Sequence, residues 1–156
     1  MYENQAAPIT IGIVEPLELD QFALTNLFNS QPSLSVVGTA TTGEEGLQLL
    51  AEKRPAIAIV EIDLEDRSGF DLASDLAMRQ RETRVVFYSA AMPDIFVEQA
   101  MRSKASGYVL KTDSLNSLLA AVREVAAGRR YFSEEIRQKL VLDSATGQMK
   151  PAFETP

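Results

Sequence analysis

Five short apolar segments, each followed by a stretch with helical periodicity, constrain the fold more than any other feature of this sequence. Each segment has four to seven residues and is rich in β-branched or aromatic side chains, which predicts a β-strand. The segments are Ile9–Val14, Leu34–Gly38, Ile57–Val60, Thr83–Ser89 and Gly107–Leu110. Strands that alternate with helices predict a parallel sheet with both faces covered. Because crossovers are right-handed, we expect an α/β fold: a three-layer, doubly wound sandwich around a five-stranded parallel sheet.

Capping residues set the limits of the helices between these strands. Thr42 and Ser114 are suitable N-caps, because their hydroxyl oxygens can accept a backbone N–H from the first helical turn. Gly128 fits the end of the fifth helix, where a left-handed residue is common. The sequence therefore divides into a disordered leader at 1–8, one folded domain at 9–132, a possible extra helix at 133–142 and a linker-like tail at 143–156.

Composition excludes several classes of chemistry. The chain has no cysteine and no histidine, which excludes disulfides, thiolate metal sites and catalysis by serine–histidine or cysteine–histidine pairs. A formal net charge of −7 repels DNA, so contact with DNA would need another domain or chain. No apolar run approaches the ~20 residues that span a bilayer. These features predict a soluble, cytoplasmic protein without a membrane contact.

Polar residues occur where four of the five strands end. Glu15 follows the first strand, Glu61 follows the third, Ser89 ends the fourth and Lys111 follows the fifth. The carboxyl ends of parallel strands meet at one edge of the sheet, where ligands gather in open α/β folds. Two carboxylates, a hydroxyl and an ammonium at this edge predict a site for an oxyanion.

The order and spacing of these four residues resemble the receiver domain of bacterial response regulators. Successive members are 46, 28 and 22 residues apart, and the similarity extends from Ile9 to Ser133. The segments PSLSVVGTATTGEEGLQLL, ASGYVLK and AAVREVAAGRRYFS are similar to the NarL/FixJ (LuxR-type) subgroup in particular. The resemblance implies a flavodoxin-like, (βα)5 fold. It also implies a role in two-component signalling, in which a histidine kinase provides a phosphoryl group for an aspartate.

The resemblance further implies a role for each residue at a matching position. In the family, the site contains a phosphoryl acceptor, an acidic pair that binds Mg²⁺, a carbonyl ligand for the metal, two phosphoryl contacts and an aromatic residue that changes rotamer on activation. The matching residues are Glu61 for the acceptor, Glu15 and Pro16 for the acidic pair, and Asp63 for the carbonyl ligand. Ser89 and Lys111 match the two phosphoryl contacts, and Tyr108 matches the aromatic residue. Gly69 matches the glycine that follows the acceptor loop.

Two departures from the family pattern change the expected chemistry. Glu61 replaces the acceptor aspartate, and Pro16 offers no side-chain oxygen to a metal. Mg²⁺ tolerates misplaced or missing ligands poorly, and Lys111 can act as a resident counter-ion instead. We therefore predict a site that works without a metal and is not phosphorylated in the usual way. A third departure is Lys104, which stands where a glycine is usual; in a left-handed conformation it would cost roughly 1 kcal/mol.

Two interpretations of Glu61 stay open at this point. Its extra methylene extends the carboxylate by about 1.5 Å, within possible reach of Ser89 and Lys111. It could therefore imitate a phosphoryl group and hold an active-like state, or the site could have decayed to leave a scaffold. Asp63 and Asp66 are expected to be solvated loop acids and not alternative acceptors.

The leading functional hypothesis is an atypical receiver that acts through protein–protein contact and is not an enzyme. The resemblance suggests a homodimer through the first and fifth helices, with Phe22 on the contact face, and a histidine kinase as a possible partner. The domain would be either the regulatory part of a DNA-binding transcriptional regulator or a stand-alone adaptor. The alternatives are Mg²⁺-dependent phosphorylation or phosphoester hydrolysis, and a pocket for a small ligand such as a flavin or nucleotide at the sheet edge.

Overall fold

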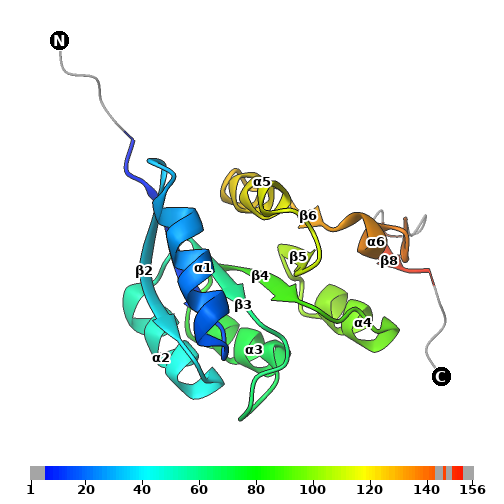
Figure 1. Ribbon diagram of the computed structural model, residues 1–156. Helices are drawn as coiled ribbons and strands as arrows, with labels where there is room; N and C mark the ends of the chain where they lie inside the picture. The colour runs from blue at the N-terminus through cyan, green and yellow to red at the C-terminus, as the bar shows by residue number, and fades with distance from the viewer. Residues whose placement is uncertain (1–5, 143–145, 147–148, 153–156) are drawn as a thin grey trace.

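The computed structural model describes residues 6–142, 146 and 149–152, in which strands and helices alternate (Figure 1). The five strand–helix units are β1 (Ile9–Val14) and α1 (Glu18–Asn29), β2 (Leu34–Ala40) and α2 (Gly43–Lys53), β3 (Ile57–Val60) and α3 (Gly69–Arg79), β4 (Arg84–Ser89) and α4 (Asp94–Arg102), and β5 (Gly107–Leu110) and α5 (Leu115–Ala126). They are followed by β6 (Tyr131–Phe132), α6 (Glu134–Arg137), β7 (Leu140–Leu142) and β8 (Met149–Pro151).

The central sheet has six parallel strands in the order β2-β1-β3-β4-β5-β6. The doubly wound α/β architecture is therefore confirmed, whereas the expected number of five strands is wrong. The additional strand, β6, pairs Tyr131 with Gly107 and Phe132 with Tyr108. Two residues are too short a segment to show the alternation of a strand, so periodicity could not predict it.

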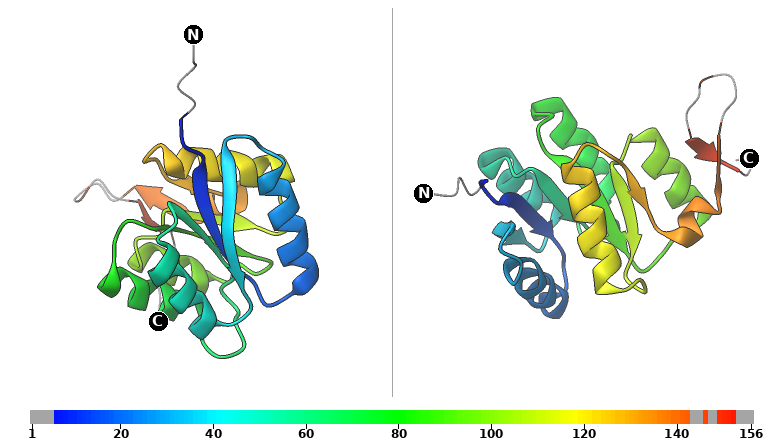
Figure 2. Two further views of the ribbon diagram at one scale, coloured as in Figure 1. Left: turned by 90° about the vertical axis from the view of Figure 1, so that its left-hand side faces the viewer. Right: turned by 90° about the horizontal axis from the view of Figure 1, so that it is seen from above.

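Helices cover both faces of the sheet (Figure 2). On one face, Leu24 and Phe28 of α1 share an apolar cluster with Leu118 and Val122 of α5. On the other face, a second cluster contains side chains from α2, α3 and α4. The central strands contribute residues to both clusters, which explains why they are almost continuously apolar. Among the described residues, no helix is both long and apolar enough to cross a membrane.

The expected helix caps are confirmed. The Thr42 hydroxyl accepts the N–H of Glu45 at 3.1 Å, and the Ser114 hydroxyl accepts the N–H of Ser117 at 3.1 Å. Gly128 follows α5 with a φ of 90°. These caps fix where α2 and α5 begin and where α5 ends.

Lys104 adopts the left-handed conformation that glycine favours. Its φ is 57°, and that of Arg54, which follows α2, is 44°. A side chain in this region costs roughly 1 kcal/mol relative to glycine. The departure from the family pattern at Lys104 therefore has the conformational consequence expected from the sequence.

The two edge strands of the sheet, β2 and β6, differ in length. Along β2, Asn29 Oδ1 accepts the N–H of Val36 at 2.9 Å, and Gln21 Nε2 donates to the carbonyl of Ala40 at 2.9 Å. The Ala40 carbonyl also accepts the N–H of Glu15 and so faces the neighbouring strand, whereas Asn29 satisfies the Val36 N–H at this edge. The opposite edge strand, β6, is only two residues long.

The C-terminal elements differ from the sequence expectation. The helix expected over 133–142 is restricted to α6, whose four residues end before Leu140–Leu142 form a strand. Leu140 is buried and Val141 is exposed, the alternation of a strand. β7 pairs antiparallel with β8, which lies in the segment expected to be a linker. Residues 6–8 are exposed without regular structure; the rest of the expected leader (1–5) and much of the tail (143–145, 147–148 and 153–156) lie outside the described residues.

Candidate functional site

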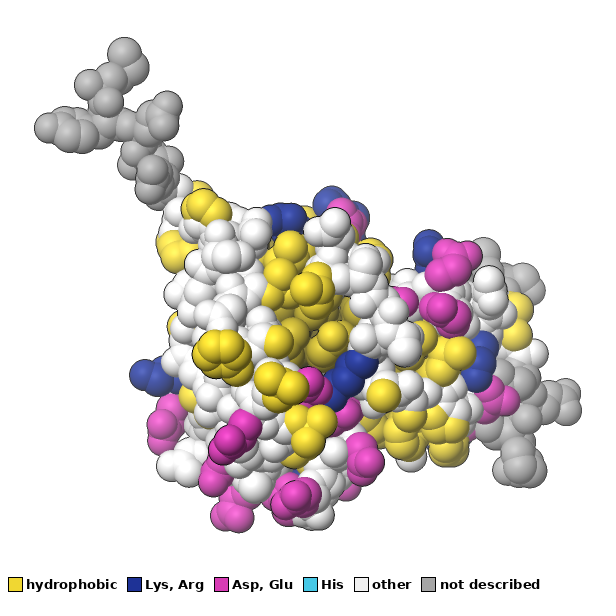
Figure 3. All heavy atoms as spheres, viewed as in Figure 1, with side chains coloured by type: hydrophobic (Ala, Val, Ile, Leu, Met, Phe, Trp, Pro, Cys, Tyr) yellow, Lys and Arg dark blue, Asp and Glu magenta, His cyan; other side chains and the backbone are white. Residues whose placement is uncertain are grey.

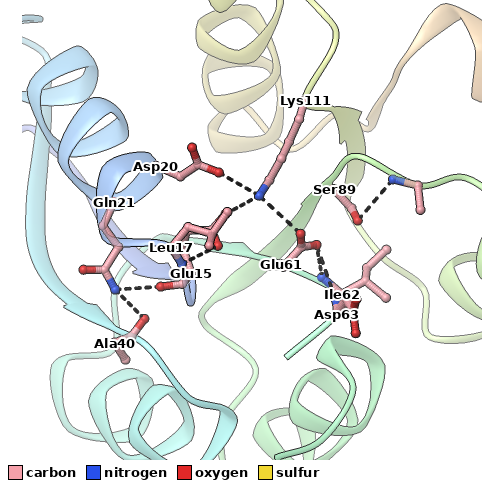
Figure 4. Close-up of polar contacts among 11 residues, drawn as sticks. Glu15, Leu17, Asp20, Gln21, Ala40, Glu61, Ile62, Asp63, Ser89 and Lys111 are labelled. Carbon is pink, nitrogen blue, oxygen red and sulfur yellow. Dashed lines mark hydrogen bonds and ion pairs between the residues drawn. The ribbon is translucent and has the colours of Figure 1, made fainter. Parts of the chain in front are cut away.

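Four strand ends place the expected polar residues at the carboxyl edge of the sheet (Figure 4). Glu15 follows β1, Glu61 follows β3, Ser89 ends β4 and Lys111 follows β5. The side chains of Glu15, Glu61 and Ser89 are buried, whereas that of Lys111 is partly exposed. The topology therefore brings together residues that are widely separated in the sequence.

The ammonium of Lys111 lies at the centre of this cluster. It donates to Glu15 Oε1 at 2.5 Å and lies 3.2 Å from Glu61 Oε1. A third carboxylate, Asp20, accepts from it at 2.9 Å, and the Tyr88 ring centroid is 5.9 Å away. Sequence reasoning missed Asp20 and Tyr88. The available signal was position, because Asp20 is in the first turn of the helix after Glu15 and Tyr88 is next to the end of β4.

Asp20 makes the site more acidic than the sequence suggested. Glu15, Asp20 and Glu61 against Lys111 give a formal charge of −2, instead of −1 for the set without Asp20. Burial raises the pKa of the Glu15 carboxyl above 4.5, and the contact with Lys111 offsets only part of this effect. Burial lowers the pKa of Lys111, but the hydrogen-bonded carboxylates outweigh it, so its pKa lies above the ordinary 10.5. Lys111 is therefore a permanently charged member of the site.

The two oxygens of the Glu61 carboxylate have different partners. Oε1 faces Lys111, and Oε2 accepts the N–H of Ile62 at 2.6 Å and that of Asp63 at 3.4 Å. The longer side chain thus folds back on the backbone that follows β3. Of the two groups expected within its reach, Lys111 is in contact, while the hydrogen bond described for Ser89 Oγ is with the N–H of Ala91 at 3.5 Å.

Tyr108 points into the protein. Its side chain is fully buried, and its ring packs edge-on against Phe87 with centroids 6.4 Å apart. The hydroxyl donates to the carbonyl of Ala91 at 2.5 Å. Burial and the nearby Glu61 raise the pKa of the Tyr108 hydroxyl above 10, so it stays a hydrogen-bond donor. Ala91 is therefore a shared partner of Tyr108 and Ser89.

The remaining site candidates lie in loops. Pro16 is half-buried in the turn before α1, and Asp63 is exposed and forms an isolated β-bridge with Ser68. Asp66 is exposed but is not merely solvated, contrary to the sequence expectation. Its carboxylate accepts the backbone N–H groups of Gly43 at 2.7 Å and Glu44 at 2.9 Å, which lowers its pKa. Asp66 thus links the loop after β3 to the beginning of α2 through two hydrogen bonds.

Gly69 closes the loop that begins at Glu61. Its N–H donates to the carbonyl of Ile62 at 2.7 Å, and its Cα lies against the backbone of Glu61 and Ile62. A Cβ at this position would be 2.5 Å from the Glu61 carbonyl oxygen. Glycine is therefore needed for close approach of the two chain segments.

The donor set does not fit Mg²⁺, the ion that the family resemblance implies. Mg²⁺ requires nearly octahedral oxygen ligands, but the Lys111 ammonium is in contact with both Glu15 and Glu61. Pro16 has no side-chain oxygen, and Glu61 Oε2 is engaged by backbone N–H groups. Within the described part of the chain, no group of three acidic side chains is arranged to hold a metal. Weak or lost Mg²⁺ binding stays a prediction.

Comparison with known proteins identifies this arrangement. The family model of the response regulator receiver domain matches residues 11–123 of the sequence. The chain belongs to this family. The receiver domain is thus a module of two-component signalling, and the identification from the sequence is confirmed. Its relatives are NarL- and LuxR-type response regulators, as the resemblance implied.

Curated relatives are similar over most of the receiver domain. The response regulator GacA of Pseudomonas aeruginosa is 30% identical over 136 residues, which are 87% of this chain and 64% of GacA. The nitrate/nitrite response regulator NarL of Escherichia coli K12 is 26% identical over 129 residues, which are 83% of this chain and 60% of NarL. The chain therefore spans somewhat less than two thirds of the length of these relatives.

Solved structures share the fold of the receiver domain. A LuxR-family response regulator from Aurantimonas has a TM-score of 0.80 at 24% identity and covers 85% of this chain and 94% of its own. The signal receiver domain of NarL from Mycobacterium tuberculosis has a TM-score of 0.76 at 24% identity and covers 80% of this chain and all of its own. These similarities confirm the flavodoxin-like fold.

Proposed function

We propose that this receiver domain signals through protein–protein contact without conventional phosphorylation. The observation that carries the proposal is the contact of the Lys111 ammonium with both Glu15 and Glu61. Lys111 supplies the positive charge that a metal would otherwise bring, and Glu61 supplies a fixed negative charge at the acceptor position. In this proposal the charges of the site are built into the chain, and the domain is not an enzyme.

An active-like state is the form of this proposal that the position of Tyr108 favours. Tyr108 is the aromatic expected to change rotamer, and its side chain is buried with its hydroxyl bonded to Ala91. Glu61 contributes to this state through Lys111 and through the backbone of Ile62. Its single negative charge makes it an incomplete imitation of a phosphoryl group, which carries nearly two.

Phosphorylation with acetyl phosphate and Mg²⁺ tests the proposal. Intact-mass spectrometry of the wild-type domain is expected to show no adduct of about 80 Da, the mass of a phosphoryl group. The variant that carries Glu61→Asp and Pro16→Asp restores the family's acids and is the positive control. A stable adduct on the wild-type domain that disappears in Glu61→Gln would establish conventional chemistry and overturn the proposal.

The proposed contact is a homodimer through α1 and α5. Phe22 is 69% exposed and Leu19 is 77% exposed on α1, and Leu115 is exposed at the start of α5. Figure 3 shows hydrophobic side chains over α1 and in the hollow between α1 and α5. Exposed apolar side chains that gather on one surface, and are not scattered singly, are typical of a contact site.

Replacing Phe22 with aspartate is expected to weaken self-association about tenfold or more, because a charge replaces a contact aromatic. Sedimentation equilibrium over a range of concentrations measures the dissociation constant. Met78→Asp is the matched control, since Met78 is 88% exposed on α3 and belongs to the other face of the sheet. Equal dissociation constants for wild type and Phe22→Asp would exclude α1 from the contact.

We also propose that the domain regulates transcription in the cytoplasm as part of a larger regulator. Its relatives include transcriptional regulatory proteins. Because the net charge of −7 repels DNA, contact with DNA would come from another domain. A histidine kinase is a candidate partner.

A small-ligand pocket at the site has less support. A groove of about 370 Å³ described in the structure lies between α3, the start of β4 and the segment 103–106 that follows α4, away from the carboxyl edge.

A further inference from the structure

Residues Ser133–Leu142, here named the C-terminal strap, connect the end of β5 with the loop between β4 and α4. At one end, the N–H of Ser133 donates to the carbonyl of Tyr108 at 2.9 Å, and its hydroxyl accepts the N–H of Leu110 at 2.9 Å. At the other end, Lys139 Nζ donates to the carbonyl of Met92 at 2.9 Å and to Asp94 Oδ1 at 2.8 Å. Figure 1 shows α6, in the middle of the strap, close to α4.

Buried apolar side chains hold the strap on the domain. Ile136 is fully buried and Leu140 nearly so, and both belong to the apolar cluster that contains Tyr108. Met92 and Phe96, from the loop and from α4, pack against the same cluster. The strap is therefore a packed part of the domain over these residues, although it follows the sixth strand.

The strap and the switch residues form a closed path that consists of hydrogen bonds and the backbone between them. The Tyr108 hydroxyl donates to the carbonyl of Ala91, and the next carbonyl, that of Met92, accepts from Lys139. The path returns through the strap to Ser133, whose N–H binds the carbonyl of Tyr108. Tyr108 is thus held at its backbone directly and at its hydroxyl through the loop that Lys139 contacts.

We propose that the C-terminal strap is an intramolecular partner of the switch, and that Lys139 is the positioning residue that keeps Tyr108 inward. Lys139 fixes the loop so that the Ala91 carbonyl stays in reach of the Tyr108 hydroxyl. This path does not pass through Glu61 or Lys111, so the strap holds Tyr108 by contacts of its own, in addition to the charged site. The inference deepens the proposed function and rests on it for the meaning of the Tyr108 rotamer. Displacement of the strap is then a route by which a segment or partner at the C-terminal side changes the switch.

NMR of the protein labelled with ¹³C in its tyrosine rings tests this inference. The chain has four tyrosines, and the Tyr108 signal is assigned by its loss in Tyr108→Phe. Lys139→Met is expected to shift the Tyr108 ring signal and to speed amide exchange at Ser133 and Leu110 about tenfold. Lys53→Met is the matched control, because Lys53 ends α2, and should leave Tyr108 unchanged. Lys139→Arg is expected to restore most of the wild-type signal, since it can donate to the same carbonyl.

The outcomes separate this inference from the proposed function. If Lys139→Met leaves the Tyr108 signal and both amide exchange rates unchanged, the strap does not position the switch and the inference is wrong. If Glu61→Gln shifts Tyr108 while Lys139→Met does not, the charged site holds the switch without the strap, which overturns the inference but leaves the proposed function standing. If Lys139→Met shifts Tyr108 while wild type acquires a phosphoryl adduct, the inference stands and the proposed function fails.

Discussion

Replacing Lys111 with methionine is expected to lower the free energy of unfolding at pH 7 by about 3 kcal/mol. Methionine keeps much of the aliphatic stem but removes the ammonium that contacts Glu15, Asp20 and Glu61. Glu15 and Glu61 are buried, so they lose their counter-ion without regaining full contact with water. Urea denaturation followed by circular dichroism measures the change.

This loss is expected to shrink as the pH falls from 7 to 5. Burial already raises the pKa of Glu15, and removing Lys111 removes a contact that lowers it, so the pKa rises further. The folded variant then binds a proton at a pH where the unfolded chain does not, and its stability increases as the pH falls through the folded-state pKa. In the wild type, the raised pKa of Lys111 makes its contribution complete below 10.5 and progressively lost above that value.

Lys53→Met is the control for the same substitution on an exposed helix end. It is expected to change the free energy of unfolding by less than about 0.5 kcal/mol. Similar losses for Lys53→Met and Lys111→Met, or a loss at Lys111 that does not depend on pH between 5 and 7, would show that the carboxylates around Lys111 tolerate its absence. The proposal of a resident counter-ion would then be wrong.

Replacing Gly69 with alanine is expected to cost about 3 kcal/mol of folding stability. The new Cβ would lie 2.5 Å from the Glu61 carbonyl oxygen and 2.9 Å from the Cα of Ile62. Both neighbours are backbone atoms, so the loop after β3 has to move, which also weakens the hydrogen bond from Gly69 to Ile62. Thermal and urea denaturation measure the loss.

Gly43→Ala is a matched control for this prediction. A Cβ at Gly43 would lie 2.4 Å from Cγ and 2.5 Å from Cδ of Arg67, so that side chain has to shift, but no backbone atom blocks it. Both glycines begin a helix, so the effect of alanine on helix propensity is similar. We expect a smaller loss for Gly43→Ala than for Gly69→Ala, because a side chain can shift more easily than the backbone of a closed loop. Equal losses for the two variants would contradict the importance of close backbone approach.

Local patterns predicted most of the fold. The apolar runs at β1, β3 and β5 match the structure in position, and the caps at Thr42 and Ser114 are where their side chains predicted. These features depend on residues within one helical turn or one strand. β6 and the β7–β8 pair were missed because short strands are stabilised by their neighbours in space and leave little periodicity in the sequence.

The candidate site was predictable only where strand ends define it. Glu15, Glu61, Ser89 and Lys111 follow from the topology, because parallel strands end at one edge. Asp20 comes from a helix, and its contact with Lys111 depends on how α1 is oriented. The same is true of the inward position of Tyr108, since a strand residue alternates between faces but its hydroxyl partner is set by a loop.

The capped and shortened sheet edges limit how this domain can aggregate. A long, unpaired edge strand is a template on which another chain can add a strand and begin a fibril. Here Asn29 occupies the Val36 N–H of β2, and β6 offers only two residues. Strand addition is therefore hindered at Val36 on one margin of the sheet and limited to two residues on the other, which favours assembly between copies through the helical surfaces.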